Sequence, residues 1–193
     1  MKIVALLGSP RAQGNSAFIM EHFLKAAARL GAETRTFALN ALRYRGCQAC
    51  YACKKTADQC VLRDDLAEVL DAVREADVLA LASPVYYGDV TSQMKAFIDR
   101  TYAYFTPEYI TNPANRSRLK PGKKFVMVLT QGHPDEKTFA DIFPRYTFFM
   151  QMYGMGEFYL IRACGLAQPD AVRSRKDVLD KAGEVAARVC NLN

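Results

Sequence analysis

The sequence predicts an α/β fold, a doubly wound parallel sheet of five strands in the order 2-1-3-4-5. Two observations predict it. Five short, largely apolar runs recur along the chain, as in strands buried on both faces of a sheet. Segments with helical periodicity separate these runs, so each strand reaches the next by a crossover. Because crossovers are right-handed, few topologies remain, and this order places a ligand crevice at the carboxyl ends of strands 1 and 3.

The expected elements alternate along the chain from strand to helix. The strands are expected at residues 2–7, 34–39, 77–82, 124–130 and 157–163. The helices are expected at residues 15 or 16 to 30, 64 or 65 to about 75, 91 to about 105, 135 to about 153, and 169 or 170 to about 189. A kink is expected in the fourth helix near Pro144, because proline cannot donate the backbone hydrogen bond of a helix interior.

Two insertions interrupt this alternation. The segment from about 43 to 63 follows the second strand and holds four cysteines, and the polar, aromatic segment from about 106 to 122 precedes the fourth strand. With 193 residues and 50% hydrophobic content, the chain can bury one sizeable core. We therefore expect a single domain over residues 1–193 that includes the cysteine-rich insertion at about 43–63.

The composition narrows the function classes. The net charge is +6, but the basic residues are spread along the chain, so we expect no nucleic-acid partner. An anionic cofactor or an acidic redox partner explains the charge instead. Gly8 and Pro10 break the first apolar run, which is too short for a signal peptide, and no stretch approaches a membrane span. A cytoplasmic location without a membrane partner is expected.

Four cysteines lie within fourteen residues, spaced C-x2-C-x2-C-x6-C: Cys47, Cys50, Cys53 and Cys60. Three thiolates at successive i, i+3 positions of a tight loop can point at one centre, and the fourth can close an iron-sulfur cluster. Basic residues outnumber acidic ones in this segment, which suits a cluster of net negative charge. Zinc binding, a disulfide and free thiols remain alternatives. Cys164 and Cys190 are expected to be packing residues.

The loop from Gly8 to Ser16 joins the first strand to the first helix, at the expected crevice. It lacks the G-x-G-x-x-G and G-x-x-x-x-G-K-[ST] patterns, so a terminal phosphate, as on FMN, fits better than a dinucleotide or a triphosphate. Backbone N–H groups at the helix start can enclose that phosphate with the side chains of the loop. The expected contacts come from Ser9, Arg11, Gly14, Asn15 and Ser16. The alternative is an ordinary glycine-rich turn with an N-cap.

The loop after the third strand approaches the same ligand. The amides of Val85 to Gly88 can meet the polar edge of a flavin ring, the tyrosines can flank its face, and Gly88 permits a positive φ. The expected contacts come from Pro84, Val85, Tyr86, Tyr87 and Gly88. The alternative is a half-buried turn. From the far side, Gln131 and Gly132 are expected to reach the crevice, and we assign no catalytic acid or base.

These motifs together resemble a known family. The sequences GSPRAQGNS at 8–16 and SPVYYGDVTSQMKAFIDR at 83–100, with the cysteine run, resemble the NAD(P)H-dependent FMN reductase-like flavodoxin-fold proteins. Within that family the chain resembles the iron-sulfur flavoproteins. The resemblance implies a flavodoxin-like fold, FMN on the two loops, a 4Fe-4S cluster on the four cysteines, and assembly as a homodimer or homotetramer.

The function that follows is electron transfer between FMN and the cluster, with an external donor and acceptor. The partner would be a redox protein such as a ferredoxin, or NAD(P)H. The apolar segment from Phe139 to Tyr153 is a candidate subunit contact, or alternatively an ordinary buried helix. The leading alternative function is a cluster-free NAD(P)H-dependent FMN or quinone reductase, and a zinc-binding module is a third.

Overall fold

The computed structural model describes residues 1–190, so the last three residues of the predicted domain lie outside it. Its five strands form one sheet in the order β2-β1-β3-β4-β5, and every neighbouring pair is parallel. The predicted fold class and strand order are confirmed. The strands, each within two residues of its expected bounds, are β1 (Lys2–Leu7), β2 (Glu33–Ala38), β3 (Val78–Pro84), β4 (Lys124–Thr130) and β5 (Glu157–Ala163).

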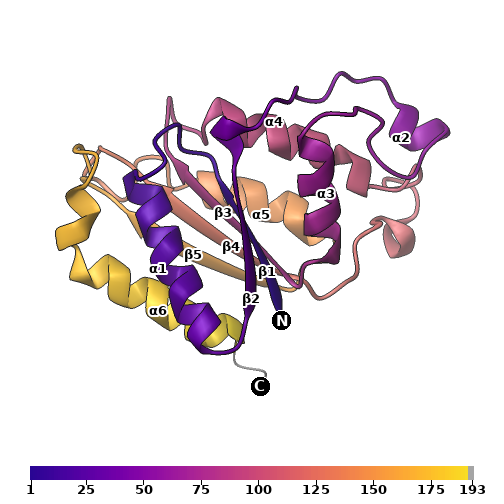
Figure 1. The fold of residues 1–193 in the computed structure, drawn as a ribbon. Helices are drawn as coiled ribbons and strands as arrows, with labels where there is room; N and C mark the ends of the chain where they lie inside the picture. Colours follow the sequence, from indigo (N-terminus) through magenta and orange to yellow (C-terminus); the bar gives the residue numbers. More distant parts are fainter. Residues whose placement is uncertain (191–193) are drawn as a thin grey trace.

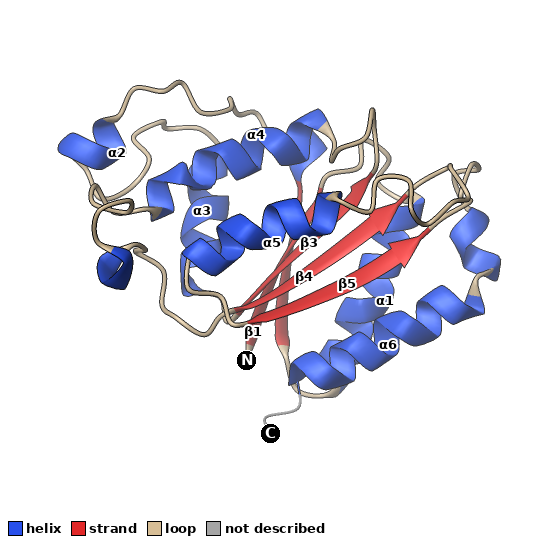
Figure 2. Cartoon of the chain, turned by 180° about the vertical axis from the view of Figure 1, so that it is seen from behind, coloured by secondary structure: helices blue, strands red, loops and turns tan. Residues whose placement is uncertain are grey.

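Helices cover both faces of the sheet, as Figures 1 and 2 show. One face packs against α1 (Asn15–Arg29) and α6 (Lys176–Cys190), and the other against α3 (Leu66–Glu75), α4 (Ser92–Arg100) and α5 (Ile142–Met152). Successive strand residues face opposite layers. In β1, for example, Val4 and Leu6 belong to the α3–α5 core, whereas Ile3 and Ala5 belong to the α1–α6 core.

Two helices begin later than predicted. Residues 135–141 are not helical, because Phe139 has a φ of +65°, which a right-handed helix excludes. Pro144 is therefore the third residue of α5, where its missing N–H needs no partner, and the predicted kink is wrong. Before α6, Ala171–Ser174 form a separate 3₁₀ turn. Similarly, α4 ends at Arg100 and continues as a 3₁₀ turn over Thr101–Tyr104.

The two predicted insertions extend from the same end of the α3–α5 layer. The cysteine segment contains the short helix α2 (Ala52–Lys55) and runs past α3 and α4 in Figure 1. The segment from 106 to 122 returns to residues 104–106, where Thr106 N–H donates to the Arg116 carbonyl at 3.0 Å and Arg118 N–H to the Tyr104 carbonyl at 2.7 Å. Among residues 1–190, no helix is both long and apolar enough to cross a membrane.

Candidate functional site

Three loops meet at the carboxyl edge of the sheet. Gly8 N–H donates to the Ala82 carbonyl at 2.8 Å, which joins the end of β1 to β3. Val85 N–H donates to the Thr130 carbonyl at 2.8 Å, which joins the loop after β3 to β4. Three predicted loops are therefore neighbours, as the strand order requires: the phosphate loop (residues 8–16), the ring loop (residues 84–88) and the β4 loop (residues 131–132).

Thr91 links the first two loops, although no motif in the sequence singles it out. Thr91 is fully buried at the N-cap of α4. Its hydroxyl donates to the Gly8 carbonyl at 2.7 Å and accepts from Met94 N–H at 3.3 Å. Its own N–H donates to the Ser83 hydroxyl at 3.0 Å. The two loops lie so close together that a Cβ on residue 8 would be only 2.9 Å from the Thr91 hydroxyl oxygen. A glycine is therefore required at this position.

The phosphate loop presents an uncapped helix start. Gly14 is the N-cap of α1, has no side chain to offer, and a Cβ there would lie 3.1 Å from the Ser9 hydroxyl oxygen. The first turn holds no acidic residue. In the described part of the chain, the Ser16 hydroxyl and the exposed Arg11 guanidinium form no hydrogen bond. The free N–H groups and the positive end of the helix dipole suit an anion.

Asn15 faces a different part of the molecule. Its amide donates to the Gln168 carbonyl at 2.7 Å and accepts from Val172 N–H at 3.1 Å. The side chain therefore anchors the loop before α6 against the phosphate loop. Any contact of Asn15 with a phosphate would come from its backbone N–H or from the remaining amide hydrogen.

The ring loop is a tight turn. Tyr86 and Asp89 exchange backbone hydrogen bonds at 2.8 and 3.1 Å, and between them Tyr87 and Gly88 have φ values of +50° and +77°. Two central residues with positive φ are typical of a type I′ turn. The N–H groups of Val85 and Tyr86 are used within the protein, whereas those of Tyr87 and Gly88 have no acceptor among residues 1–190. Tyr87 is fully exposed.

Asp89 ties the turn to α5. It accepts from the Tyr146 hydroxyl at 2.7 Å, and Arg145 bonds both Asp89, at 3.2 Å, and the Gly88 carbonyl, at 3.3 Å. Burial and the Asp89 carboxylate raise the pKa of Tyr146 above its ordinary value, so the phenol remains a donor. No local motif singles out this carboxylate, because an Asp in a turn is common and its partners lie more than fifty residues away.

The side chain of Gln131 is occupied by the protein. Its amide donates to the carbonyls of His133 and Asp135, both at 3.0 Å, and accepts from Arg162 at 2.6 Å. Gln131 thus shapes the β4 loop from a buried position. If this loop contacts a cofactor as predicted, the contact would come from Gly132 and from the backbone of the loop rather than from the Gln131 side chain.

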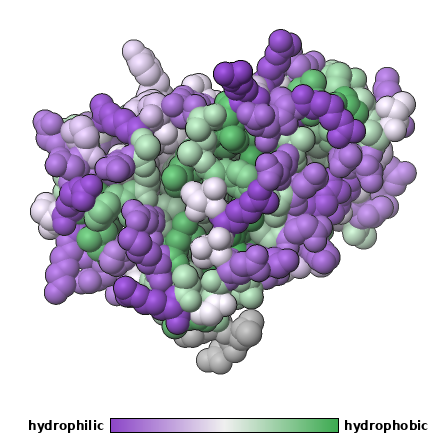
Figure 3. Space-filling view, in the orientation of Figure 1, coloured by the Kyte–Doolittle hydropathy of each residue, from purple (hydrophilic) through white to green (hydrophobic). Residues whose placement is uncertain are grey.

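The four cysteines of the insertion line one cavity of about 110 Å³. They are free thiols, of which Cys47 and Cys50 are exposed and Cys53 and Cys60 partly buried. Ala49 and Tyr51 have φ values of +51° and +58°, which turn the backbone sharply between the cysteines. Figure 3 shows apolar residues in green, surrounded by polar ones, near the end of the molecule where Figure 1 places α2.

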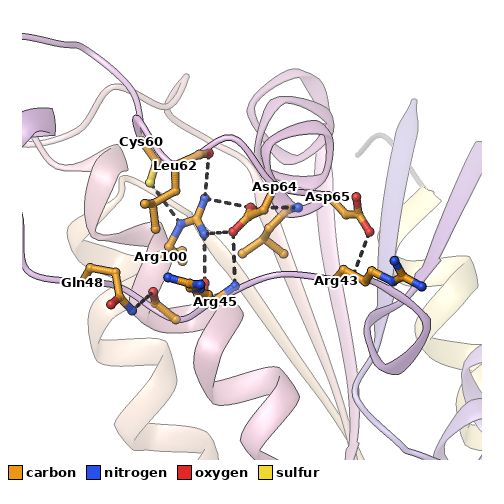
Figure 4. Close-up of polar contacts among 10 residues, drawn as sticks. Arg43, Arg45, Gln48, Cys60, Leu62, Asp64, Asp65 and Arg100 are labelled. Carbon is orange, nitrogen blue, oxygen red and sulfur yellow. Dashed lines mark hydrogen bonds and ion pairs between the residues drawn. The ribbon is translucent and has the colours of Figure 1, made fainter.

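Two cationic side chains bond the partly buried sulfurs. The Lys54 ammonium lies 3.6 Å from Cys53 Sγ and donates to the Tyr102 and Phe105 carbonyls at 2.7 and 2.8 Å. Burial lowers the pKa of Lys54, and the Cys53 thiol opposes this shift. On the other side, Arg100 Nε donates to Cys60 Sγ at 3.0 Å, as Figure 4 shows.

The four cysteines of this cavity offer thiol donors for a metal centre. Among residues 1–190, no three His, Cys, Asp or Glu side chains form a group that could hold a single metal ion. A cubane cluster has a different requirement, because each of four thiolates binds its own iron atom. All four cysteines line the cavity, and cations lie beside the Cys53 and Cys60 sulfurs, so these residues are candidates to hold such a cluster. Cys164 and Cys190 do not line this cavity.

Comparison with known proteins gives the family. Residues 1–162 match the family described as NADPH-dependent FMN reductase. An iron-sulfur flavoprotein of Archaeoglobus fulgidus is 41% identical over 138 residues, which cover 70% of this chain and 58% of that protein. An iron-sulfur flavoprotein of Methanosarcina thermophila is 39% identical over 101 residues, or 52% of each chain. The matched parts thus span only about half the length of these curated relatives.

Solved structures match the whole fold at low identity. An FMN-dependent NADH-azoreductase from Bacillus anthracis, in complex with FMN, has a TM-score of 0.76 at 17% identity and covers 99% of this chain and all of its own. An NAD(P)H:quinone oxidoreductase from Methanothermobacter marburgensis has a TM-score of 0.76 at 18% identity. The match covers 100% of this chain and 98% of the oxidoreductase chain. The match over most of the sequence shows that the chain belongs to the NADPH-dependent FMN reductase family, a family of oxidoreductases.

Proposed function

We propose that this chain is an FMN-dependent oxidoreductase that also holds a 4Fe-4S cluster on Cys47, Cys50, Cys53 and Cys60. The observation that supports the cluster most strongly is the single cavity lined by all four thiols, with a cation at each of the two partly buried sulfurs. The names of the similar iron-sulfur flavoproteins support the same assignment.

FMN would bind at the carboxyl edge of the sheet. The N–H groups at the start of α1, the Ser9 and Ser16 hydroxyls and the Arg11 guanidinium would hold its phosphate. Gly14 keeps the helix start open, since any side chain there would crowd Ser9. The family match and the FMN bound by the similar azoreductase support FMN as the occupant.

The ring of FMN would lie against the turn after β3. The N–H groups of Tyr87 and Gly88 are donors available for its polar edge, and the exposed Tyr87 ring could flank its face. Pro84 and Val85 lead into the turn, and Asp89 fixes it to α5 through Tyr146. A turn fixed at both ends presents its donors in one orientation, which suits a flat polar ligand.

The two centres would divide the redox work. When bound, FMN exchanges one or two electrons and the cluster exchanges one, so a pair of electrons can be split. The chain's own residues bind and orient the centres, and Lys54 and Arg100 offset the negative charge of the thiolates. The external donor would be NAD(P)H or a redox protein such as a ferredoxin, and the functional unit a homodimer or homotetramer.

A cluster-free NAD(P)H-dependent FMN or quinone reductase is the second candidate. It is favoured by the exposure of Cys47 and Cys50, which resemble surface thiols, and by the similarity to quinone oxidoreductases. In that case the nicotinamide would stack on the flavin beside the turn after β3, and the cysteines would have no part in the reaction.

The test is a measurement of iron, acid-labile sulfide and FMN per chain after anaerobic purification and reconstitution. We expect about four irons and four sulfides for each FMN, with visible absorption beyond that of the flavin. FMN without iron would overturn the cluster assignment and favour the second candidate. The absence of FMN after incubation with an excess of it would overturn the flavin site.

A further inference from the structure

Arg100 is a charged residue buried at the base of the cysteine segment. Its side chain has no exposed surface, although it belongs to the last turn of α4. A buried cation needs partners for each of its donors, because removing a guanidinium from water is costly. The partners of Arg100 therefore indicate which groups the protein places around it.

The guanidinium bonds both ends of the cysteine segment, as Figure 4 shows. Nη1 donates to the Arg45 carbonyl at 2.9 Å and to Asp64 at 2.8 Å. Nη2 donates to Asp64 at 3.2 Å and to the Leu62 carbonyl at 3.4 Å. The bidentate pair with Asp64 fixes the plane of the fork and directs Nε to Cys60 Sγ, 3.0 Å away.

The contact between Arg100 Nε and Cys60 Sγ is not needed to hold the two ends of the cysteine segment together, because the Nη atoms already do so. A neutral thiol is a weak acceptor, so a buried N–H of a guanidinium gains little from it. A thiolate that ligates a metal centre carries negative charge, and the same contact becomes a charge-assisted hydrogen bond. The 3.0 Å contact therefore directs a fully buried cation at the sulfur that would ligate the cluster.

Of the four cysteines, Cys60 is the one whose role as a ligand is least supported by sequence spacing, because six residues separate it from Cys53. Cys47 and Cys50 are exposed to solvent, which would screen the effect of a charged side chain beside them. Cys60 is partly buried, and its sulfur faces a fully buried cation. The electrostatic effect of Arg100 on a bound cluster should consequently exceed that of any exposed basic residue nearby.

We propose that Arg100 is a positioning residue that holds the Cys60 sulfur as a cluster ligand and raises the reduction potential of the bound cluster. The inference rests on the proposed function, since it requires the cluster. Reduction adds negative charge, so a buried cation stabilises the reduced state more than the oxidised state. Asp64 moderates the effect by pairing with the same guanidinium.

The test compares the cluster potential in four variants of the anaerobically reconstituted protein, by redox titration followed by electron paramagnetic resonance. In Arg100→Gln, the ratio of reduced to oxidised cluster at a fixed potential should fall about tenfold, or about 59 mV for one electron. Asp64→Asn should shift the potential upward, because it removes a negative charge and leaves the cation. Arg100→Lys should stay nearer to the wild type. Among residues 1–190, the exposed Arg63 side chain forms no hydrogen bond to Cys60 or Arg100, so Arg63→Gln should change the ratio less than twofold.

The two ideas fail in different ways. If the wild type binds no iron, the proposed function fails and this inference with it. If the wild type holds the cluster and Arg100→Gln keeps its potential, only the role of Arg100 is overturned. If Arg100→Gln retains no cluster or does not fold, the potentials of Asp64→Asn and Arg100→Lys provide the test instead. An upward shift of the potential in Asp64→Asn supports the role of Arg100. Unchanged potentials in both variants overturn that role. FMN content and circular dichroism report the fold in each variant.

Discussion

Replacing Thr91 by valine tests whether one hydroxyl fixes the two loops of the proposed flavin site. Valine keeps the shape of threonine, so the packing of this fully buried position should be retained. The change removes the donor to the Gly8 carbonyl and the acceptor for Met94 N–H, which lie 2.7 and 3.3 Å from the hydroxyl oxygen. The result should be a less stable protein with a looser phosphate loop.

The magnitude follows from the two lost bonds. Loss of a threonine N-cap costs about 1 kcal/mol, and a buried carbonyl left without a donor costs about 1–3 kcal/mol. Thr91→Val should therefore lower the free energy of unfolding by about 2–4 kcal/mol. Thr91→Ser keeps the hydroxyl and loses a methyl group, for about 1 kcal/mol.

The assay is urea unfolding of the FMN-free protein, followed by circular dichroism, with flavin affinity measured separately. Both variants should unfold with the slope of the wild type, which would show that the unfolded states are equally exposed. The affinity for FMN should fall more in Thr91→Val than in Thr91→Ser. A loss below about 1 kcal/mol in Thr91→Val, or an equal loss in both variants, would refute the role of the hydroxyl.

Three further predictions concern single side chains. Cys50→Ser should abolish binding of iron and leave FMN bound, because the thiol is exposed and supports no core packing; loss of flavin, measured by absorption, would contradict this. Arg11→Ala should weaken FMN binding by about 1.5–3 kcal/mol in a fluorescence titration, with Arg29→Ala as a control at the other end of α1. For Asp64, partial burial opposes ionisation, but hydrogen bonds from Arg100 and Arg45 N–H outweigh it and hold its pKa below the ordinary value. A folded pKa below the unfolded one means that ionised Asp64 stabilises the protein above about pH 4 and that this contribution disappears as the pH falls through the folded pKa. The stability difference between wild type and Asp64→Asn, from urea unfolding of the metal-free protein, should therefore shrink below about pH 4, and a constant difference would argue against the ion pair.

The sheet could be predicted because each strand is visible as an apolar run in the sequence, and the right-handed crossover rule then limits the order of the strands. The start of α5 could not, since Phe139 takes a positive φ that a bulky aromatic residue rarely adopts. That conformation places its ring against Gly88, where a Cβ would lie 3.2 Å from Phe139 Cε1. The contact between Phe139 and Gly88, about fifty positions apart, therefore outweighs the local helical pattern. Nothing in the sequence around residue 139 indicates this contact.

The candidate site divides in the same way. Glycines and cysteines could be selected from spacing, since their chemistry requires them at fixed offsets. Thr91, Asp89 and Arg100 act through partners remote in sequence, so only the folded chain identifies them. Gln131 illustrates a different case, because the side chain that we expect at the ligand crevice bonds to the protein itself, a set of contacts that no local pattern indicates.

The most direct test of the two-centre account is an anaerobic reductive titration of the reconstituted protein that counts electrons per chain. FMN accepts two electrons and the cluster one, so the account predicts about three per chain, and about two in Cys50→Ser. Two electrons in both proteins would contradict the account and leave a flavin reductase without a cluster.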